Sequence, residues 1–199
     1  MREFRGKGVI VTGGASGIGL GIARAFALEG AKLCLADIDS EALESARKEI
    51  EALGAEVMLA PADVSDPASV AAAAAVAQNA LGKIHIAVNN AGVALHGPDI
   101  EAVPLNDCHW AFGVNVFGII HGIKSFLPLI RIHGEGGHIV NTASIAGFRA
   151  WPGLRYGIYA ATKHAVIALW KSISTEFAKP LRIVPNRVQP VSNDAGTLY

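Results

Sequence analysis

The chain has 199 residues, of which 51% are hydrophobic and 17% charged, so it is long enough to bury one substantial core. Its 17 basic and 17 acidic residues cancel, which argues against nucleic acid or an anionic membrane surface as a partner. The N-terminus lacks an apolar signal region, no apolar run approaches the roughly 20 residues of a membrane span, and two cysteines give no disulfide framework, so we expect a cytoplasmic protein.

Strand and helix patterns alternate along the first half of the chain. Apolar runs predict strands at residues 9–12, 32–36 and 56–60. Apolar residues at helical spacing predict helices at 17–29, 40–53 and 67–81, and a glycine follows each of them. Asp66 and Pro67 suit the N-cap and first position of the third helix. The residues of the first helix expected to face the core are Ile18, Ile22, Ala25 and Phe26.

The alternation continues with strands at 84–88 and 138–142 and with helices at 107–132 and 156–178. Strands that are apolar on both faces and joined by helices require a parallel sheet covered on both sides. The sequence therefore predicts a doubly wound α/β fold with three layers, α/β/α. No linker or repeat divides residues 1–199, so a single domain is expected. Right-handed crossovers place ligands at the carboxyl ends of such strands.

A glycine turn lies between the first predicted strand and the first predicted helix, with the sequence Thr12-Gly13-Gly14-Ala15-Ser16-Gly17-Ile18-Gly19. Glycine lets the backbone approach a ligand closely, and the N–H groups at the start of a helix favour negative charge, so the turn suits a pyrophosphate. Its spacing, G-x-x-x-G-x-G, differs from the G-x-G-x-x-G of the common dinucleotide motif. A turn that serves packing alone is the alternative.

Asp37 closes the second predicted strand, at the position where an acidic side chain accepts hydrogen bonds from an adenosine ribose. A carboxylate there would repel a 2′-phosphate, and Ser16 in the glycine turn supplies no compensating cation, so NAD is predicted over NADP. Alternatively, Asp37 caps the helix that follows it, a role that Asp39 and Ser40 also suit.

Tyr159 and Lys163 lie four residues apart, on one face of the last predicted helix. At 4 Å and an effective dielectric of 20, the ammonium group would favour the phenolate by about 4 kcal/mol, which suits acid–base chemistry near neutral pH. A surface pair on an amphipathic helix is the alternative. The seven histidines are scattered without the spacing of a helical metal site, so no metal is predicted.

Taken together and in chain order, the glycine turn, Asp63, Asn89-Asn90-Ala91-Gly92, Asn115, Ser144 and Tyr159-x-x-x-Lys163 resemble the short-chain dehydrogenase/reductase family over about residues 6–177. The resemblance implies a Rossmann-type fold that binds NAD. It places the pyrophosphate at the glycine turn, the adenosine ribose at Asp37 and the adenine at Asp63 and Val64. The cofactor-binding residues that it implies are Gly13, Ser16, Gly17, Ile18, Gly19, Asp37, Asp63, Val64, Asn90, Ala91, Gly92, Tyr159 and Lys163.

The resemblance also implies hydride transfer between a nicotinamide and a secondary alcohol or ketone. Tyr159 would be the general acid/base, since an alcohol must lose its hydroxyl proton as the hydride leaves. Ser144 would polarise the substrate oxygen, Lys163 would hold the nicotinamide ribose, and Asn115 would anchor a water that relays protons to Lys163. Tyr156 is expected to pack or to touch the substrate. The other candidate substrate contacts, which favour an apolar or aromatic compound, are Val93, Leu95, Phe148, Trp151 and Leu154.

The match decays after Phe177, because Val191 follows Pro190 where the family has a Pro-Gly turn, and few residues follow for a substrate lid and a seventh strand. Pro185 fits an edge strand. We expect a member with a short or missing C-terminal part, or one whose open edge a partner covers, paired through its two long helices as a dimer or tetramer. The other classes considered are a catalytically silent nucleotide-binding protein and a methyltransferase, which would not need Tyr159 and Lys163.

Overall fold

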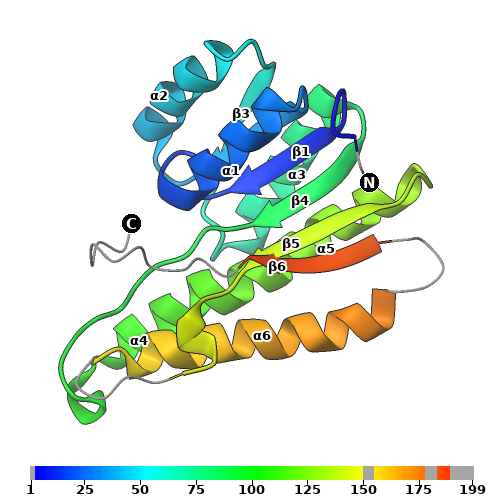
Figure 1. The fold of residues 1–199 in the computed structure, drawn as a ribbon. Helices are drawn as coiled ribbons and strands as arrows, with labels where there is room; N and C mark the ends of the chain where they lie inside the picture. Colours follow the sequence, from blue (N-terminus) through cyan, green and yellow to red (C-terminus); the bar gives the residue numbers. More distant parts are fainter. Residues whose placement is uncertain (1–2, 150–154, 178–182, 189–199) are drawn as a thin grey trace.

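The computed structural model describes residues 3–149, 155–177 and 183–188 and contains a parallel sheet between two layers of helices (Figure 1). The described strands follow the order β3-β2-β1-β4-β5-β6 across the sheet, so β2 and β3 lie on one side of β1 and β4 to β6 on the other, and such folds bind ligands at this switch point between β1 and β4. The predicted doubly wound α/β fold is confirmed. The strands are β1 (Gly8–Thr12), β2 (Lys32–Asp37), β3 (Val57–Pro61), β4 (Ile84–Asn89), β5 (Gly137–Thr142) and β6 (Ile183–Val188).

The longer helices are α1 (Gly17–Leu28), α2 (Ser40–Glu51), α3 (Pro67–Leu81), α4 (Leu105–Phe112), α5 (Gly118–Ile132) and α6 (Gly157–Phe177). Helices α1 and α2 cover one face of the sheet, and α3, α5 and α6 cover the other (Figure 1). Side chains alternate along a strand, so Val9 and Val11 of β1 pack under α1 and α2 while Ile10 packs on the opposite side. Both faces of the central strands are therefore dry, as their sequence predicted.

The buried face of α1 differs from the prediction. Ile18 and Ala25 are exposed, and the buried residues of the helix are Gly19, Ala23 and Ala27. Small residues at this spacing let α1 lie close to β1, because a β-carbon added at Gly19 would come 1.9 Å from the carbonyl oxygen of Gly13. Ile22 and Phe26 pack against the core as predicted, and the prediction was wrong for Ile18 and Ala25, because the helix packs most closely through its small residues and leaves Ile18 at the ligand edge.

The helix predicted at 107–132 begins earlier, at Leu105, and its α-helical parts are joined by a π-helical segment, η2 (Gly113–Phe117). Segments of this kind often occur at functional sites, and Asn115 lies within this one. The combined helix has 28 residues and is long and apolar enough to cross a membrane by length and composition, but 50% of its most apolar window is buried inside the fold. That burial is typical of a core helix.

Strand β6 is the outermost strand of the described sheet, and Pro185 within it pairs in register with Ile139 of β5. A proline has no N–H to donate to a further strand, so Pro185 is compatible with the place of β6 outermost among the described strands. Pro190 and Val191, on which the predicted divergence of the C-terminal turn depends, lie outside the described residues.

Candidate active site

The glycine turn at the carboxyl edge of the sheet has no room for a side chain at Gly13, Gly14 or Gly19. Gly13 and Gly17 have φ angles of 62° and 49°, which favour glycine. A β-carbon at Gly13 would lie 2.8 Å from the Cα of Ala91, in the loop after β4. Ser16 is the N-cap of α1, and its side chain makes no capping hydrogen bond. The first N–H groups of α1 are therefore available to an anion, so this turn fits a pyrophosphate.

Asp37 is held in place beside this turn at the end of β2. One carboxylate oxygen accepts a hydrogen bond from the Ala15 N–H at 3.0 Å and the other accepts from the Asp39 N–H at 3.3 Å. Asp39 caps α2, accepting from the N–H groups of Glu41 and Ala42, so the alternative role of Asp37 as that cap is wrong. None of the ion pairs within the described ranges involves Asp37.

Asn90 connects the ends of three strands. Its side-chain amide donates to the carbonyl of Gly13 at 3.2 Å, and its side-chain oxygen accepts from the hydroxyl of Thr142 at 3.1 Å. The hydroxyl of Thr12 accepts from the N–H groups of Asn90 and Ala91, at 3.0 and 3.2 Å. The loop after β4 is thus fixed against the glycine turn. Sequence analysis assigned no role to the hydroxyls of Thr12 and Thr142, since their partners lie far away in the chain.

Asp63 and Val64 lie in the turn after β3, as predicted. One carboxylate oxygen of Asp63 accepts from the N–H and the hydroxyl of Ser65, at 2.8 and 2.7 Å. The carbonyl of Val64 is 2.9 Å from Nδ1 of His121 on α5. These contacts hold the turn rigidly at the same sheet edge as Asp37.

Helix α6 brings Tyr159 and Lys163 together. The side chain of Lys163 is buried, its Nζ donates to the carbonyl of Thr142 at 3.1 Å, and it lies 5.8 Å from the centre of the Tyr159 ring. Burial lowers the pKa of Lys163 from its usual 10.5 to about 8. A buried ammonium group contradicts the alternative of a surface pair. The arrangement places a positive charge beside a half-buried phenol, which suits proton transfer by that phenol.

Ser144 precedes the short helix η3 (Ile145–Gly147), just after β5, and its hydroxyl oxygen accepts the N–H of Ala146 at 3.2 Å. The hydroxyl proton therefore remains able to point elsewhere. Ala146 packs with Ala160 and Tyr159 of α6, which brings the η3 turn against the start of that helix. Ser144 and Tyr159 thus come from different elements to the same edge of the sheet.

Asn115 is fully buried, and its amide is occupied by protein partners. Its oxygen accepts the N–H of Val93 at 2.8 Å, and its nitrogen donates to the carbonyl of Val93 at 2.9 Å and to the hydroxyl of Thr162 at 3.0 Å. Both amide protons are used, so they are unavailable to the relay water expected from the sequence. Thr162 was missed by sequence analysis, because nothing in the local pattern distinguishes it from an ordinary helical threonine.

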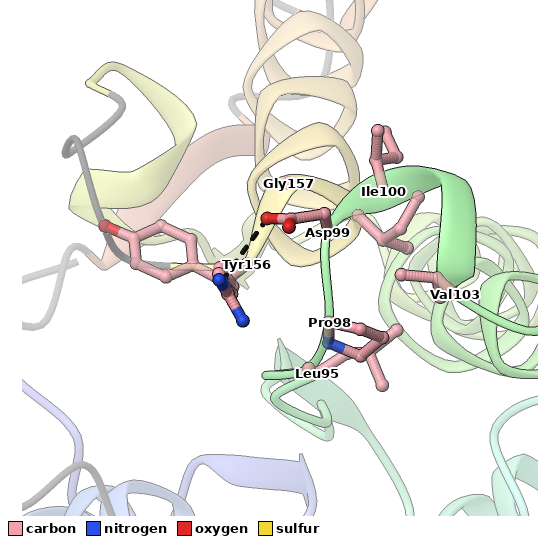
Figure 2. Close-up of a pocket in the computed structure, with 10 residues that line it drawn as sticks. Leu95, Pro98, Asp99, Ile100, Val103, Tyr156 and Gly157 are labelled. Atoms are coloured by element: carbon pink, nitrogen blue, oxygen red, sulfur yellow. Dashed lines mark ion pairs between the residues drawn. The ribbon is translucent and has the colours of Figure 1, made fainter.

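A cavity of about 370 Å³ lies between the loop after β4 and the start of α6 (Figure 2). An ion pair crosses it, with Nε of Arg155 3.3 Å from a carboxylate oxygen of Asp99. Tyr156 forms part of the wall and packs edge-on against Tyr159, with ring centres 6.3 Å apart, so the cavity adjoins the candidate general acid/base. The lining residues are Leu95, Gly97, Pro98, Asp99, Ile100, Val103, Arg155, Tyr156, Gly157 and Ile158.

The predicted substrate contacts agree with this cavity only in part. Leu95 lines it, whereas Val93 binds Asn115 through its main chain, and Phe148 is exposed and does not line it. Trp151 and Leu154 lie outside the described residues. The segment from Gly97 to Val103 was missed because it shows no periodic pattern, and its partner residues at 155–158 come much later in the chain.

A second polar cluster lies at the opposite, amino edge of the sheet. Its donor atoms, on His85, His133 and Glu135, lie within 4.8 Å of one another, as in a metal site. However, His85 accepts from the Gly8 N–H and both ring nitrogens of His133 bond to main-chain groups. Glu135 pairs with two lysines, Lys7 and Lys83. The cluster is therefore a closed hydrogen-bonded network, and its two ammonium groups disfavour a cation.

Comparisons with known proteins agree with this geometry. The sequence profile described as short chain dehydrogenase matches residues 7–195. A curated relative, 1-deoxy-11-beta-hydroxypentalenate dehydrogenase of Streptomyces avermitilis, is 37% identical over 186 residues, which are 90% of this chain and 67% of that protein. This chain spans between 55% and 67% of the length of such curated relatives.

Two similar solved structures contain different nicotinamide cofactors. A short chain dehydrogenase/reductase from Burkholderia phymatum in complex with NAD superposes with a TM-score of 0.90 at 41% identity, covering 96% of this chain and 67% of that one. A short chain dehydrogenase from Burkholderia cenocepacia in complex with NADP gives a TM-score of 0.89 at 33% identity, covering 97% of this chain and 77% of that one. Similar proteins thus carry either cofactor.

Proposed function

The chain belongs to the short-chain dehydrogenase family, and we propose that it is an oxidoreductase that transfers a hydride between NAD and a secondary alcohol or ketone. The observation that carries the proposal is the buried Lys163 ammonium beside the Tyr159 ring, at the same sheet edge as the glycine turn. A buried cation without a carboxylate partner in the described chain lowers the stability of the fold. Such a cost is typical of a functional site, and support of proton transfer at Tyr159 would account for it here.

The carboxyl edge of the sheet would hold the cofactor along its whole length. The pyrophosphate would be surrounded by Gly13, Ser16, Gly17, Ile18 and Gly19. A side chain at Gly13 or Gly19 would fill the space that the phosphates need. The adenosine part would meet Asp37, Asp63 and Val64. The residues on the nicotinamide side would be Asn90, Ala91, Gly92, Tyr159 and Lys163. When bound, the cofactor supplies or accepts the hydride.

Three side chains would carry the proton chemistry, and a fourth would hold the neighbouring loop in place. For alcohol oxidation, Tyr159 takes the hydroxyl proton as the C–H bond gives up its hydride, and for ketone reduction it returns a proton to the carbonyl oxygen. Lys163 favours the phenolate through its charge. Ser144 donates its hydroxyl proton to the substrate oxygen, and Asn115 holds the loop after β4 through Val93.

The preference for NAD rests on Asp37. Its carboxylate is tied to the N–H of Ala15, so it is fixed at the position of the ribose hydroxyls and would repel a 2′-phosphate. The substrate preference rests on the cavity beside Tyr159. Leu95, Ile100 and Val103 form apolar parts of its wall beside the polar groups of Asp99 and Arg155, and these apolar parts support an apolar or aromatic alcohol or ketone.

We also propose that copies of this chain pair through the long helices as a dimer or tetramer, as a single-domain cytoplasmic protein. Leu105, Trp110 and Phe117 are 74%, 49% and 52% exposed along α4 and η2, and a partner copy would cover them. The balanced charge of the chain gives no reason to invoke a nucleic acid or membrane partner.

Measuring binding and turnover separately tests the proposal. NADH and NADPH titrations followed by fluorescence give cofactor affinity, and a panel of 1-phenylethanol, cyclohexanol and their ketones gives turnover. We expect NADH binding and measurable turnover, with turnover falling roughly 10²- to 10⁴-fold in Tyr159→Phe while NADH affinity is kept. Binding without any turnover on a wider panel would favour a silent nucleotide-binding protein. Wild-type rates in Tyr159→Phe would contradict the assignment of the acid/base.

A further inference from the structure

We propose that Thr162 is a positioning residue of this site, whose hydroxyl fixes the Tyr159–Lys163 turn of α6 to Asn115. The hydroxyl is fully buried, accepts from the Asn115 amide at 3.0 Å and donates to the carbonyl of Tyr159 at 2.7 Å. A threonine that bonds only to its own helix is common. Here the same oxygen also takes an amide proton from another helical segment, which links the two.

The link continues beyond Asn115. That amide binds both the N–H and the carbonyl of Val93, which follows directly on Asn90, Ala91 and Gly92. A β-carbon at Gly92 would lie 3.1 Å from the Asn115 oxygen and 3.4 Å from the Lys163 ammonium. The loop after β4, the π-helical segment and α6 therefore meet around one network, with Thr162 as its contact on α6.

Thr162 is the only side chain of α6 that bonds to Asn115 within the described ranges. Without its hydroxyl, a buried amide proton would have no partner and Tyr159 would lose a bond to its carbonyl. The first turns of α6 would then be free to shift against η2. The separation of the Lys163 ammonium from the Tyr159 ring, now 5.8 Å, would no longer be fixed, so the charge would support proton transfer less effectively.

The inference rests on the proposed function, since this separation matters for catalysis only if Tyr159 transfers the proton. A merely structural role predicts something different. Loss of a buried hydrogen bond would lower the melting temperature but would leave the pH profile of the remaining folded enzyme unchanged. The pH profile and the effect of a conservative replacement therefore separate the two roles.

Three variants of the full chain test it. Thr162→Val removes the hydroxyl at nearly constant shape, and Thr162→Ser keeps the hydroxyl. Ser45→Val is the matched control, because the Ser45 hydroxyl also donates to a carbonyl of its own helix, that of Glu41 at 3.2 Å, at an exposed position of α2. The measurements are NADH affinity, kcat and its pH profile for 1-phenylethanol oxidation, melting temperature, and hydrogen exchange at the Val93 amide.

For Thr162→Val we expect a loss in kcat of about 10- to 100-fold, as for a small misplacement of reacting groups. Its NADH affinity should stay within about twofold of wild type, because the contacts of the glycine turn and Asp37 with the pyrophosphate and the adenosine part remain. Its pH of half-maximal kcat should rise and its Val93 amide should exchange faster, whereas Thr162→Ser and Ser45→Val should behave as wild type.

A Thr162→Val enzyme with the wild-type kcat and pH profile would overturn the inference, whatever its melting temperature. If the wild-type chain binds NADH but turns over nothing, the proposed function fails instead. Hydrogen exchange then still decides about Thr162: faster exchange at Val93 supports the link, and unchanged exchange overturns it.

Discussion

At the carboxyl edge of the sheet Lys163 is buried with a single hydrogen bond to the described residues, to a main-chain carbonyl, whereas at the amino edge Glu135 contacts Lys7, Lys83 and His85. Burial lowers the pKa of Lys163 to about 8, so folding works against its charge. The three donors hold the pKa of Glu135 far below its usual range, so folding favours its charge. The carboxyl edge thus holds a buried ammonium group with no carboxylate beside it in the described chain, whereas the carboxylate at the amino edge is paired with cations.

This difference between the two edges indicates that a ligand binds at the carboxyl edge. A closed network such as that at Glu135 gains nothing from a further group, since its donors and acceptors already have partners. The carboxyl edge instead presents uncapped N–H groups at α1, a fixed carboxylate at Asp37 and the buried cation of Lys163. The uncapped N–H groups and the buried cation lower stability unless something binds there. Removing the charge of Lys163 should therefore raise stability and remove activity, whereas removing that of Glu135 should lower stability and leave activity unchanged.

The largest effect should follow from filling the glycine turn. In Gly19→Ala the new β-carbon would lie 1.9 Å from the carbonyl oxygen of Gly13. We expect NADH affinity to fall at least about 100-fold, because the backbone must move away from the phosphate position. Gly21→Ala on the same helix is the control, since a β-carbon there meets nothing within 4 Å. Equal NADH affinities in the two variants would remove the turn from the cofactor site.

The next effect concerns the choice of cofactor. Asp37→Ser removes the carboxylate that the Ala15 N–H holds, and we expect the NADPH-to-NADH affinity ratio to rise about 10- to 100-fold as the repulsion disappears. Asp39→Asn removes a charge two positions away while keeping an acceptor for the α2 cap, and should leave the ratio within about twofold. Similar shifts in both variants would mean that general charge, rather than the position of Asp37, sets the preference.

Replacing the buried cation should raise stability while it removes activity. A shift in the pKa of Lys163 from 10.5 to about 8 corresponds to roughly 3 kcal/mol of folding free energy at 1.36 kcal/mol per unit. Lys163→Met should therefore unfold at higher urea concentration than wild type at pH 7. Between pH 8 and 10.5 the unfolded chain still binds a proton that folded Lys163 has lost, so wild-type stability rises and the advantage of the variant shrinks.

Urea melts at pH 7 and pH 10 check this prediction, and the difference between the two proteins cancels the titration of all other groups. A less stable Lys163→Met at pH 7 would mean that the ammonium contributes to the fold. The contrast between the two edges would then disappear.

The smallest effect belongs to the amino edge. Glu135→Gln leaves the lysines and His85 without their shared carboxylate, so we expect its melting temperature at pH 7 to fall by a few degrees. NADH affinity and kcat should not change. The depressed pKa of Glu135 stabilises the wild-type fold at neutral pH, and this contribution is lost as pH falls through the acid range. The variant should thus be less acid-sensitive, as melting curves from pH 7 to pH 3 would reveal.

Features that depend on residues close together in the sequence were predictable. The glycine turn lies between a strand and a helix that the apolar pattern identified, and Tyr159 and Lys163 share a helix face because they are four residues apart. Asp66 caps α3 with its own side chain, as its position before Pro67 predicted. In each case the partners lie within one turn or two adjacent elements, so spacing alone fixes their geometry.

Features that depend on distant partners were not predictable. The bond between Asn115 and Thr162 spans 47 positions, and the ion pair of Asp99 with Arg155 joins a loop without periodic pattern to the start of a helix. The exposure of Ile18 was also missed, because an apolar residue at helical spacing normally faces the core. Here the close contact of Gly19 with the turn rotates that face away, and only the packed fold reveals it.

Isotope transfer tests the central claim most directly, that the carboxyl edge performs hydride transfer with Tyr159 as the acid/base. Acetophenone, which belongs to the substrate panel, is incubated with the chain and with NADH carrying deuterium at both hydrogen positions of nicotinamide C4, and the alcohol product is analysed by mass spectrometry. We predict deuterium on the carbinol carbon with the wild-type chain and at least about 100-fold less of this product per unit time with Tyr159→Phe, although both bind NADH. An alcohol without deuterium, or equal transfer by the two proteins, would contradict the account.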